Sequence, residues 1–136
     1  MELTKPTKDK SFLIGCLKGK TILVAEDDDT NFFLLREYLN ITEAKIDWVQ
    51  NGLEAVDYFK FDNNANAILM DIQMPVLNGM EAMLRIKKLN PTIPIIALTA
   101  YAMQGDREKF LSAGFNAYMT KPVVQTSLVE LIKYYC

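Results

Sequence analysis

The chain has 136 residues and half of them are hydrophobic, which is the size and composition of one domain with a buried core. A formal net charge of -2 and a pI of about 5.2 exclude a broad basic surface for nucleic acid, and no hydrophobic run reaches the roughly 18 residues that a membrane span needs. Histidine is absent, which excludes a histidine base, a histidine metal ligand and a phosphohistidine on this chain.

Residues 1–19 follow no regular pattern, and their lysines and short hydrophobic stretch predict a linker or an N-terminal tail. One domain is expected over residues 20–136, and its first half should run strand, helix, strand, helix. Hydrophobic, β-branched runs predict the strands Thr21–Ala25 and Lys45–Val49. The helix between them, capped by a residue at 28–30, should bury Phe32, Leu35 and Leu39. The helix after Asn51-Gly52 should use Leu53, Val56 and Tyr58 or Phe59.

The second half of the predicted domain continues the alternation of strand and helix. A strand at Ala67–Met70 is followed, after a turn, by a helix at Met80–Leu89. A strand at Ile95–Leu98 precedes a helix at Gln104–Ser112, which should stop at Gly114 in the left-handed conformation. The last strand is Ala117–Met119, and the last helix, Val124–Tyr135, has a hydrophobic face of Val124, Leu128, Leu131 and Tyr135.

This alternation predicts an α/β fold, a doubly wound parallel sheet covered by helices on both faces. Ligands of such sheets bind outside the carboxyl ends of the strands. Polar side chains follow those ends in this chain: Glu26, Asp27, Asp71, Gln73, Thr99 and Lys121. We therefore expect them to border one shallow pocket.

Three carboxylates in one pocket, from Glu26, Asp27 and Asp71, would repel one another unless a cation lay among them. Oxygen ligands without nitrogen or sulfur partners favour Mg²⁺. We assign Asp27 and Asp71 as direct ligands, the backbone carbonyl of Gln73 as the third protein oxygen, and Glu26 as a ligand through water. Asp71 can accept a phosphoryl group as an acyl-phosphate. Thr99 and Lys121 would then contact the phosphoryl oxygens.

Each of these residues alone also has a structural explanation. The acidic residues after the first strand could serve simply as helix caps, and Asp71 could be a turn residue. Thr99 could be an ordinary residue at the end of a strand, and Lys121 a solvated loop charge. Four such coincidences at successive strand ends are less expected than one site, so the sequence favours the phosphorylatable aspartate.

Five motifs in this order resemble receiver domains of two-component response regulators: Ile22-Leu-Val-Ala-Glu-Asp27, Ile68-Leu-Met-Asp-Ile-Gln-Met-Pro75, Asn78-Gly79, Ala97-Leu-Thr-Ala100 and Tyr118-Met-Thr-Lys-Pro122. The sequences of these motifs most resemble those of receivers fused to hybrid sensor histidine kinases. The resemblance implies a flavodoxin-like sheet with strand order 2-1-3-4-5 and phosphoryl transfer to Asp71 from a phosphohistidine. It also implies that Tyr118 is a movable aromatic that acts with Thr99 as a switch.

The predicted protein is a phosphoacceptor with slow self-dephosphorylation rather than an enzyme with turnover. Its expected partners are a histidine kinase or histidine phosphotransfer protein and a downstream protein, which binds the face of the fourth helix, fifth strand and fifth helix. Direct binding to nucleic acid or membrane is not expected. Cys16 and Cys136 have no metal-ligand spacing, which favours a reducing, cytoplasmic location. The chain would be a single-domain regulator or the receiver of a larger hybrid kinase.

Two other classes of function remain open. A phosphatase or phosphotransferase with an aspartyl intermediate would also use aspartate and Mg²⁺, but would need a second acid where Gln73 stands. A phosphorylation-independent interaction module would be expected to lack some of the site residues, and none is missing. We further expect Gln73 and Tyr101 to border the path of water to phosphorylated Asp71, and the Lys121–Pro122 peptide bond to be cis.

Overall fold

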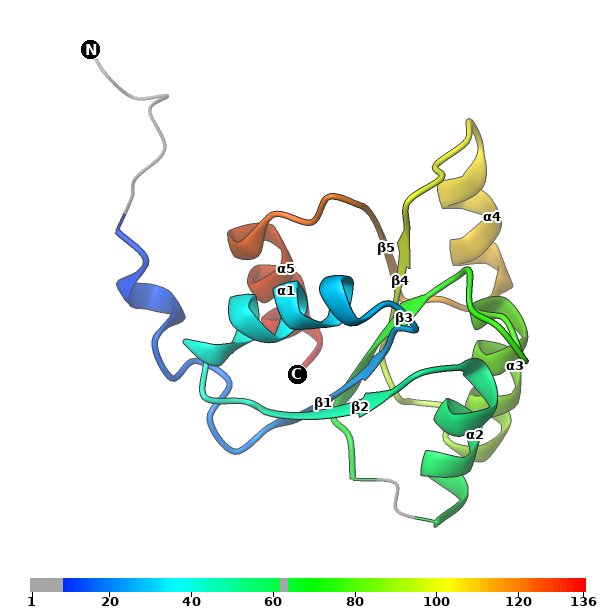
Figure 1. The fold of residues 1–136 in the computed structure, drawn as a ribbon, viewed down its shortest axis with the longest axis horizontal. Helices are drawn as coiled ribbons and strands as arrows, with labels where there is room; N and C mark the ends of the chain where they lie inside the picture. The colour runs from blue at the N-terminus through cyan, green and yellow to red at the C-terminus, as the bar shows by residue number, and fades with distance from the viewer. Residues whose placement is uncertain (1–8, 62–63) are drawn as a thin grey trace.

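The computed structural model describes residues 9–61 and 64–136 and has one parallel sheet between two layers of helices (Figure 1). The strands are β1 (Thr21–Ala25), β2 (Lys45–Val49), β3 (Ala67–Asp71), β4 (Ile95–Thr99) and β5 (Ala117–Thr120). The helices are α1 (Asp29–Asn40), α2 (Gly52–Phe61), α3 (Gly79–Leu89), α4 (Asp106–Ala113) and α5 (Gln125–Tyr135), preceded by a short 3₁₀ turn, η1 (Ser11–Leu13).

The strands pair in the order β2-β1-β3-β4-β5, and every pairing is parallel. The predicted flavodoxin-like α/β fold is therefore confirmed. The central position of β3 places the end of that strand, Asp71, between the ends of β1 and β4. The Lys121–Pro122 peptide bond is cis, as the sequence predicted.

Alternation along the strands separates two hydrophobic cores, because successive side chains of a strand point to opposite faces. On β1, Leu23 faces the core under α2, α3 and α4, whereas Ile22 and Val24 face the core under α1 and α5. Figure 1 shows α1 and α5 side by side on one face of the sheet. The predicted inward residues of α1, Phe32, Leu35 and Leu39, are all buried there.

Three details at helix ends differ from the sequence predictions. Leu53 is exposed, whereas the predicted Val56 and Phe59 are buried in α2 together with Ala55. Val124 is 60% exposed because it caps α5 in an extended conformation rather than joining the buried face. The fourth helix begins at Asp106 rather than at Gln104, and Gly114 ends it as predicted, with a positive φ of 135° that favours glycine but is not that of the αL conformation.

The second half of the predicted N-terminal tail contacts the domain. Leu13 and Leu17 are buried in the core under α1 and α5. The backbone N–H groups of Gly15 and Leu17 donate to the carbonyl oxygens of Ile41 and Thr42, at 2.9 and 3.0 Å. The start of the receiver-like unit at residue 20 stays a prediction. Among residues 9–61 and 64–136, no helix is both long and apolar enough to cross a membrane.

Candidate functional site

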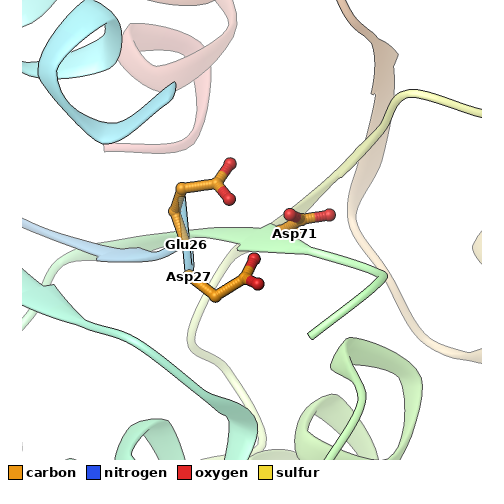
Figure 2. A group of neighbouring side chains, drawn as sticks. All are labelled: Glu26, Asp27 and Asp71. Carbon is orange, nitrogen blue, oxygen red and sulfur yellow. The ribbon is translucent and has the colours of Figure 1, made fainter. Parts of the chain in front are cut away.

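Three carboxylates meet at the carboxyl edge of the sheet. Glu26 and Asp27 follow β1, and Asp71 ends the neighbouring strand β3. One carboxylate oxygen from each residue lies within 4.8 Å of the others. Figure 2 shows the three side chains turned toward a common space. The sequence prediction that strand ends would gather these groups is therefore correct in geometry.

The local backbone holds two of these carboxylates in place. Asp71 is only 6% exposed, and its Oδ1 accepts a hydrogen bond from the backbone N–H of Gln73 at 3.1 Å. Glu26 is 1% exposed, and its Oε2 accepts one from the backbone N–H of Asp28 at 3.2 Å. Asp27 is exposed at the mouth of the cluster. The site thus combines two buried acids with one that faces solvent.

Lys121, the first residue after β5, brings a positive charge to the cluster. Its Nζ lies 2.7 Å from Glu26 Oε1 and 3.2 Å from Asp71 Oδ2. The backbone N–H of Lys121 donates to the carbonyl oxygen of Thr99 at 2.8 Å, which fixes the start of the loop after β5. Burial lowers the pKa of Lys121, but the hydrogen bond to Glu26 and the charge of Asp71 outweigh it, so this pKa is raised and the ammonium stays charged.

The balance at Glu26 runs the other way. Burial raises the pKa of its carboxyl group, Lys121 lowers it, and the neighbouring Asp71 raises it again, with a net rise. One lysine therefore does not offset the desolvation and repulsion of this acid. A further cation among the three carboxylates would favour their charged forms. An all-oxygen donor set of this kind fits a hard cation such as Mg²⁺.

The remaining predicted site residues border the same edge. Thr99 ends β4, is buried, and accepts a hydrogen bond at Oγ1 from the backbone N–H of Tyr101 at 3.1 Å. Gln73 and Tyr101 are exposed, and with Thr99 they line a hollow between the loops after β3 and β4. Their positions are compatible with the predicted path of water, and their effect on hydrolysis stays a prediction.

Tyr118 lies away from the carboxylates, on β5 beside α4. Its ring stacks on Phe110, with the centroids 5.5 Å apart. The hydroxyl is buried and has no hydrogen-bond partner within the described part of the chain. The residue as a whole is half-buried and packs against the core under α2, α3 and α4, and its predicted inward turn on phosphorylation stays a prediction. Its role as a switch stays a prediction.

Gly79 is a site residue whose role the sequence analysis missed. A Cβ atom at this position would lie 2.3 Å from the carbonyl oxygen of Asp71. Its backbone N–H donates to the carbonyl of Ile72 at 2.9 Å, which closes the loop from β3 back onto its own start. Only glycine permits this approach, and its place after Asn78 was the available signal.

Comparison with known proteins agrees with this geometry. The family model described as the response regulator receiver domain matches residues 22–133. The chain belongs to the response regulator receiver domain family. It is therefore a receiver domain of two-component signalling.

Two curated relatives illustrate the settings in which such domains occur. The chain is 41% identical to Hybrid signal transduction histidine kinase I of Dictyostelium discoideum over 119 residues, which cover 82% of this chain and 7% of that protein. The chain thus corresponds to only a small part of the length of that relative. It is 36% identical to the polar-differentiation response regulator DivK of Brucella anthropi over 118 residues, or 85% of this chain and 95% of DivK.

A solved structure provides a comparison for the cluster of three carboxylates. The receiver domain of the sensor histidine kinase PA1611 from Pseudomonas aeruginosa is 36% identical, with a TM-score of 0.78. The match covers 86% of this chain and 97% of that receiver, whose crystal structure has a magnesium ion coordinated in the active site cleft. A CheY-like receiver domain protein from Methanospirillum hungatei matches with 29% identity, a TM-score of 0.77 and coverage of 85% and 91%.

Proposed function

We propose that Asp71 is the phosphoacceptor of this receiver and takes its phosphoryl group from a phosphohistidine on a histidine kinase or histidine phosphotransfer protein. The observation that carries the proposal is the position of Lys121 Nζ, 2.7 Å from Glu26 Oε1 and 3.2 Å from Asp71 Oδ2. These two carboxylates and that of Asp27 each have an oxygen within 4.8 Å of the others. A nucleophile, a fixed positive charge and a set of oxygen ligands thus lie together.

In the transfer, a carboxylate oxygen of Asp71 bonds to phosphorus while the phosphorus–nitrogen bond of the partner's phosphohistidine breaks. The electron pair of the broken bond stays on the imidazole nitrogen. Lys121 and the Thr99 hydroxyl stabilise the charge on the phosphoryl oxygens as the group moves. Because these groups come from strand ends of a rigid sheet, they are held in place before the reaction begins.

The same cluster would hold Mg²⁺. Asp27, Asp71 and the backbone carbonyl of Gln73 would be its direct protein ligands, with Glu26 acting through water. The bound ion would neutralise negative charge on the phosphoryl group. The magnesium ion in the receiver of PA1611 supports this assignment for a relative with 36% identity.

The regulatory output would come from the face formed by α4, β5 and α5. Phosphorylation adds charge and acceptor oxygens, toward which Thr99 and Lys121 would close. The space behind Thr99 would then change, and the buried Tyr118 hydroxyl could gain a partner there. Energetically this is a population shift, limited by how differently the phosphoryl group interacts with the two states. A downstream protein that reads the face would bind one state better than the other.

The central test is chemical labelling of the isolated protein. Incubation with a small phosphodonor and Mg²⁺ should place one base-labile phosphoryl group on Asp71, located by mass spectrometry. The Asp71→Asn variant should remain unlabelled. Full labelling of that variant would remove Asp71 as the acceptor.

The metal assignment has its own test. Asp27→Ala removes one direct ligand and should weaken Mg²⁺ binding by at least about tenfold, because loss even of outer-sphere partners costs that much. The fold should survive, since the change also removes a charge from a repulsive cluster. Parent-like affinity, measured by titration calorimetry, would show that Asp27 is not a ligand.

A further inference from the structure

The single tryptophan of the chain, Trp48, contacts the backbone of the acidic cluster from the edge strand β2. Its indole Nε1–H donates a hydrogen bond to the backbone carbonyl oxygen of Glu26 at 2.8 Å. That carbonyl belongs to the first residue after β1, which ends at Ala25. The Trp48 side chain therefore fixes the first peptide group after β1, in the loop that carries Glu26 and Asp27.

The peptide that Trp48 holds connects two of the three carboxylates. Its carbonyl belongs to Glu26 and its nitrogen to Asp27. On the other side of Glu26, the backbone N–H donates to the carbonyl of Val49 at 3.0 Å. With both bonds in place, the plane of the Glu26–Asp27 peptide is fixed relative to β2. The direction in which the exposed Asp27 side chain leaves the backbone is then fixed too.

The indole ring is itself held in position by α1. It stacks on Phe32 with the centroids 3.9 Å apart and an angle of 4° between the rings, and Phe33 meets it edge-on at 6.1 Å. A half-buried ring packed in this way has few alternative rotamers. The packing of the ring thus keeps its N–H directed at the Glu26 carbonyl oxygen and prevents it from turning toward water.

We propose that Trp48 is a positioning residue for the metal site: its N–H orients the Glu26–Asp27 peptide and, through it, the Asp27 carboxylate. The inference rests on the proposed function, in which Asp27 is a direct Mg²⁺ ligand. Without the bond, the peptide can rotate, and part of the binding energy of the ion is used to restore the orientation. The competing explanation is that Trp48 only packs against α1, and it predicts no effect of the N–H on Mg²⁺.

The test removes the N–H in two ways, of which only the first keeps the bicyclic ring. Trp48 is replaced by its benzothiophene analogue, which has sulfur where the indole has N–H, and separately by phenylalanine in Trp48→Phe. We expect both proteins to bind Mg²⁺ about two- to tenfold more weakly than the parent, the range that corresponds to one net hydrogen bond. The matched control is Phe33→Leu, which removes a ring contact but leaves the N–H in place and should bind Mg²⁺ as the parent does.

A second measurement separates positioning from packing. In an NMR spectrum the single tryptophan of the parent gives one indole N–H resonance. Mg²⁺ should shift this resonance, because binding of the ion by Asp27 should change the hydrogen bond between the indole N–H and the Glu26 carbonyl. Equal Mg²⁺ affinity of the parent and the benzothiophene analogue, at equal thermal stability, would overturn the inference while leaving the proposed function intact. If the parent itself bound no Mg²⁺, the proposed function would fail first, and the inference with it.

Discussion

Two lysines at opposite ends of the sheet show how differently the same side chain is used. Lys121, at the carboxyl edge, contacts two carboxylates, Glu26 and Asp71. Lys87, on α3 at the amino edge, donates to the carbonyl oxygen of Ile93 at 2.7 Å and to Asn116 Oδ1 at 2.8 Å. Both ammonium groups join separate segments of the chain, but of the two only Lys121 forms ion pairs with carboxylates within residues 9–61 and 64–136.

The pKa values of these lysines shift in opposite directions. Burial lowers the pKa of Lys87, and its neutral acceptors do not compensate. The pKa of Lys121 is raised despite burial, because Glu26 and Asp71 attract its proton. The amino edge thus uses a lysine to join two loops, whereas at the carboxyl edge the raised pKa favours the charged form of Lys121, which the proposed phosphoryl transfer would need.

The largest expected difference between the two lysines is in phosphorylation. Lys121→Met should slow labelling of Asp71 by a small phosphodonor about 100-fold, the usual effect of losing one group that stabilises transition-state charge. Lys87→Met should label at the parent rate. Initial rates at saturating Mg²⁺ measure both, and similar slowing of the two variants would mean that Lys121 acts through the fold rather than on the phosphoryl group.

A smaller effect, on stability, should reverse the comparison. Lys87→Met leaves the carbonyl of Ile93 and one lone pair of Asn116 without their donor, and should lower the free energy of unfolding by about 1–3 kcal/mol. The neighbouring Lys88 is exposed on the same helix, so Lys88→Met is the matched control and should change little. Urea denaturation of the metal-free proteins gives the values. Equal stability of the two variants would remove the structural role of Lys87.

At alkaline pH, the ionisation of the two lysines should change the free energy of unfolding in opposite directions. Because the folded pKa of Lys121 is raised, its contribution is complete below the unfolded value of about 10.4 and is lost as pH rises through the folded value. The folded pKa of Lys87 is lowered, so the part of its stability that depends on ionisation is present above about pH 10.4 and is lost as pH falls through the folded value. The hydrogen bonds that its ammonium donates to Ile93 and Asn116 are a separate contribution, which the comparison with Lys87→Met measures at neutral pH. Stability of the metal-free parent relative to Lys121→Met should therefore fall above that pH, whereas stability relative to Lys87→Met should rise toward it. Parallel curves would contradict the opposite shifts.

The smallest expected effect concerns the lifetime of the phosphorylated state. Tyr101 is 68% exposed beside the hollow that Gln73 and Thr99 also line, and its ring could shield phosphorylated Asp71 from water. Tyr101→Ala should accelerate dephosphorylation less than about fivefold, which is about 1 kcal/mol of barrier, with Mg²⁺ binding unchanged. Identical time courses for the variant and the parent would mean that Tyr101 is only a surface residue.

The sequence by itself determined the succession of strands and helices along the chain and the residues gathered at the carboxyl edge, but not the order of the strands within the sheet. Each strand is a short hydrophobic run with a polar residue just beyond it, and this pattern is local. Once the runs pair in parallel, Asp27 and Asp71 must meet, because the carboxyl ends of parallel strands share one edge. The family resemblance added the order of the strands, which no local pattern specifies.

Only the tertiary structure decided the contacts that link distant segments. Leu13 and Leu17 are hydrophobic in sequence, but their burial depends on the surface that α1 and α5 present. The bond from Trp48 to Glu26 spans 22 positions and arises from the pairing of β2 with β1. Lys87 looks like any helix-surface lysine until the loops at Ile93 and Asn116 surround it. Such contacts depend on the closing of the fold, so local spacing does not predict them.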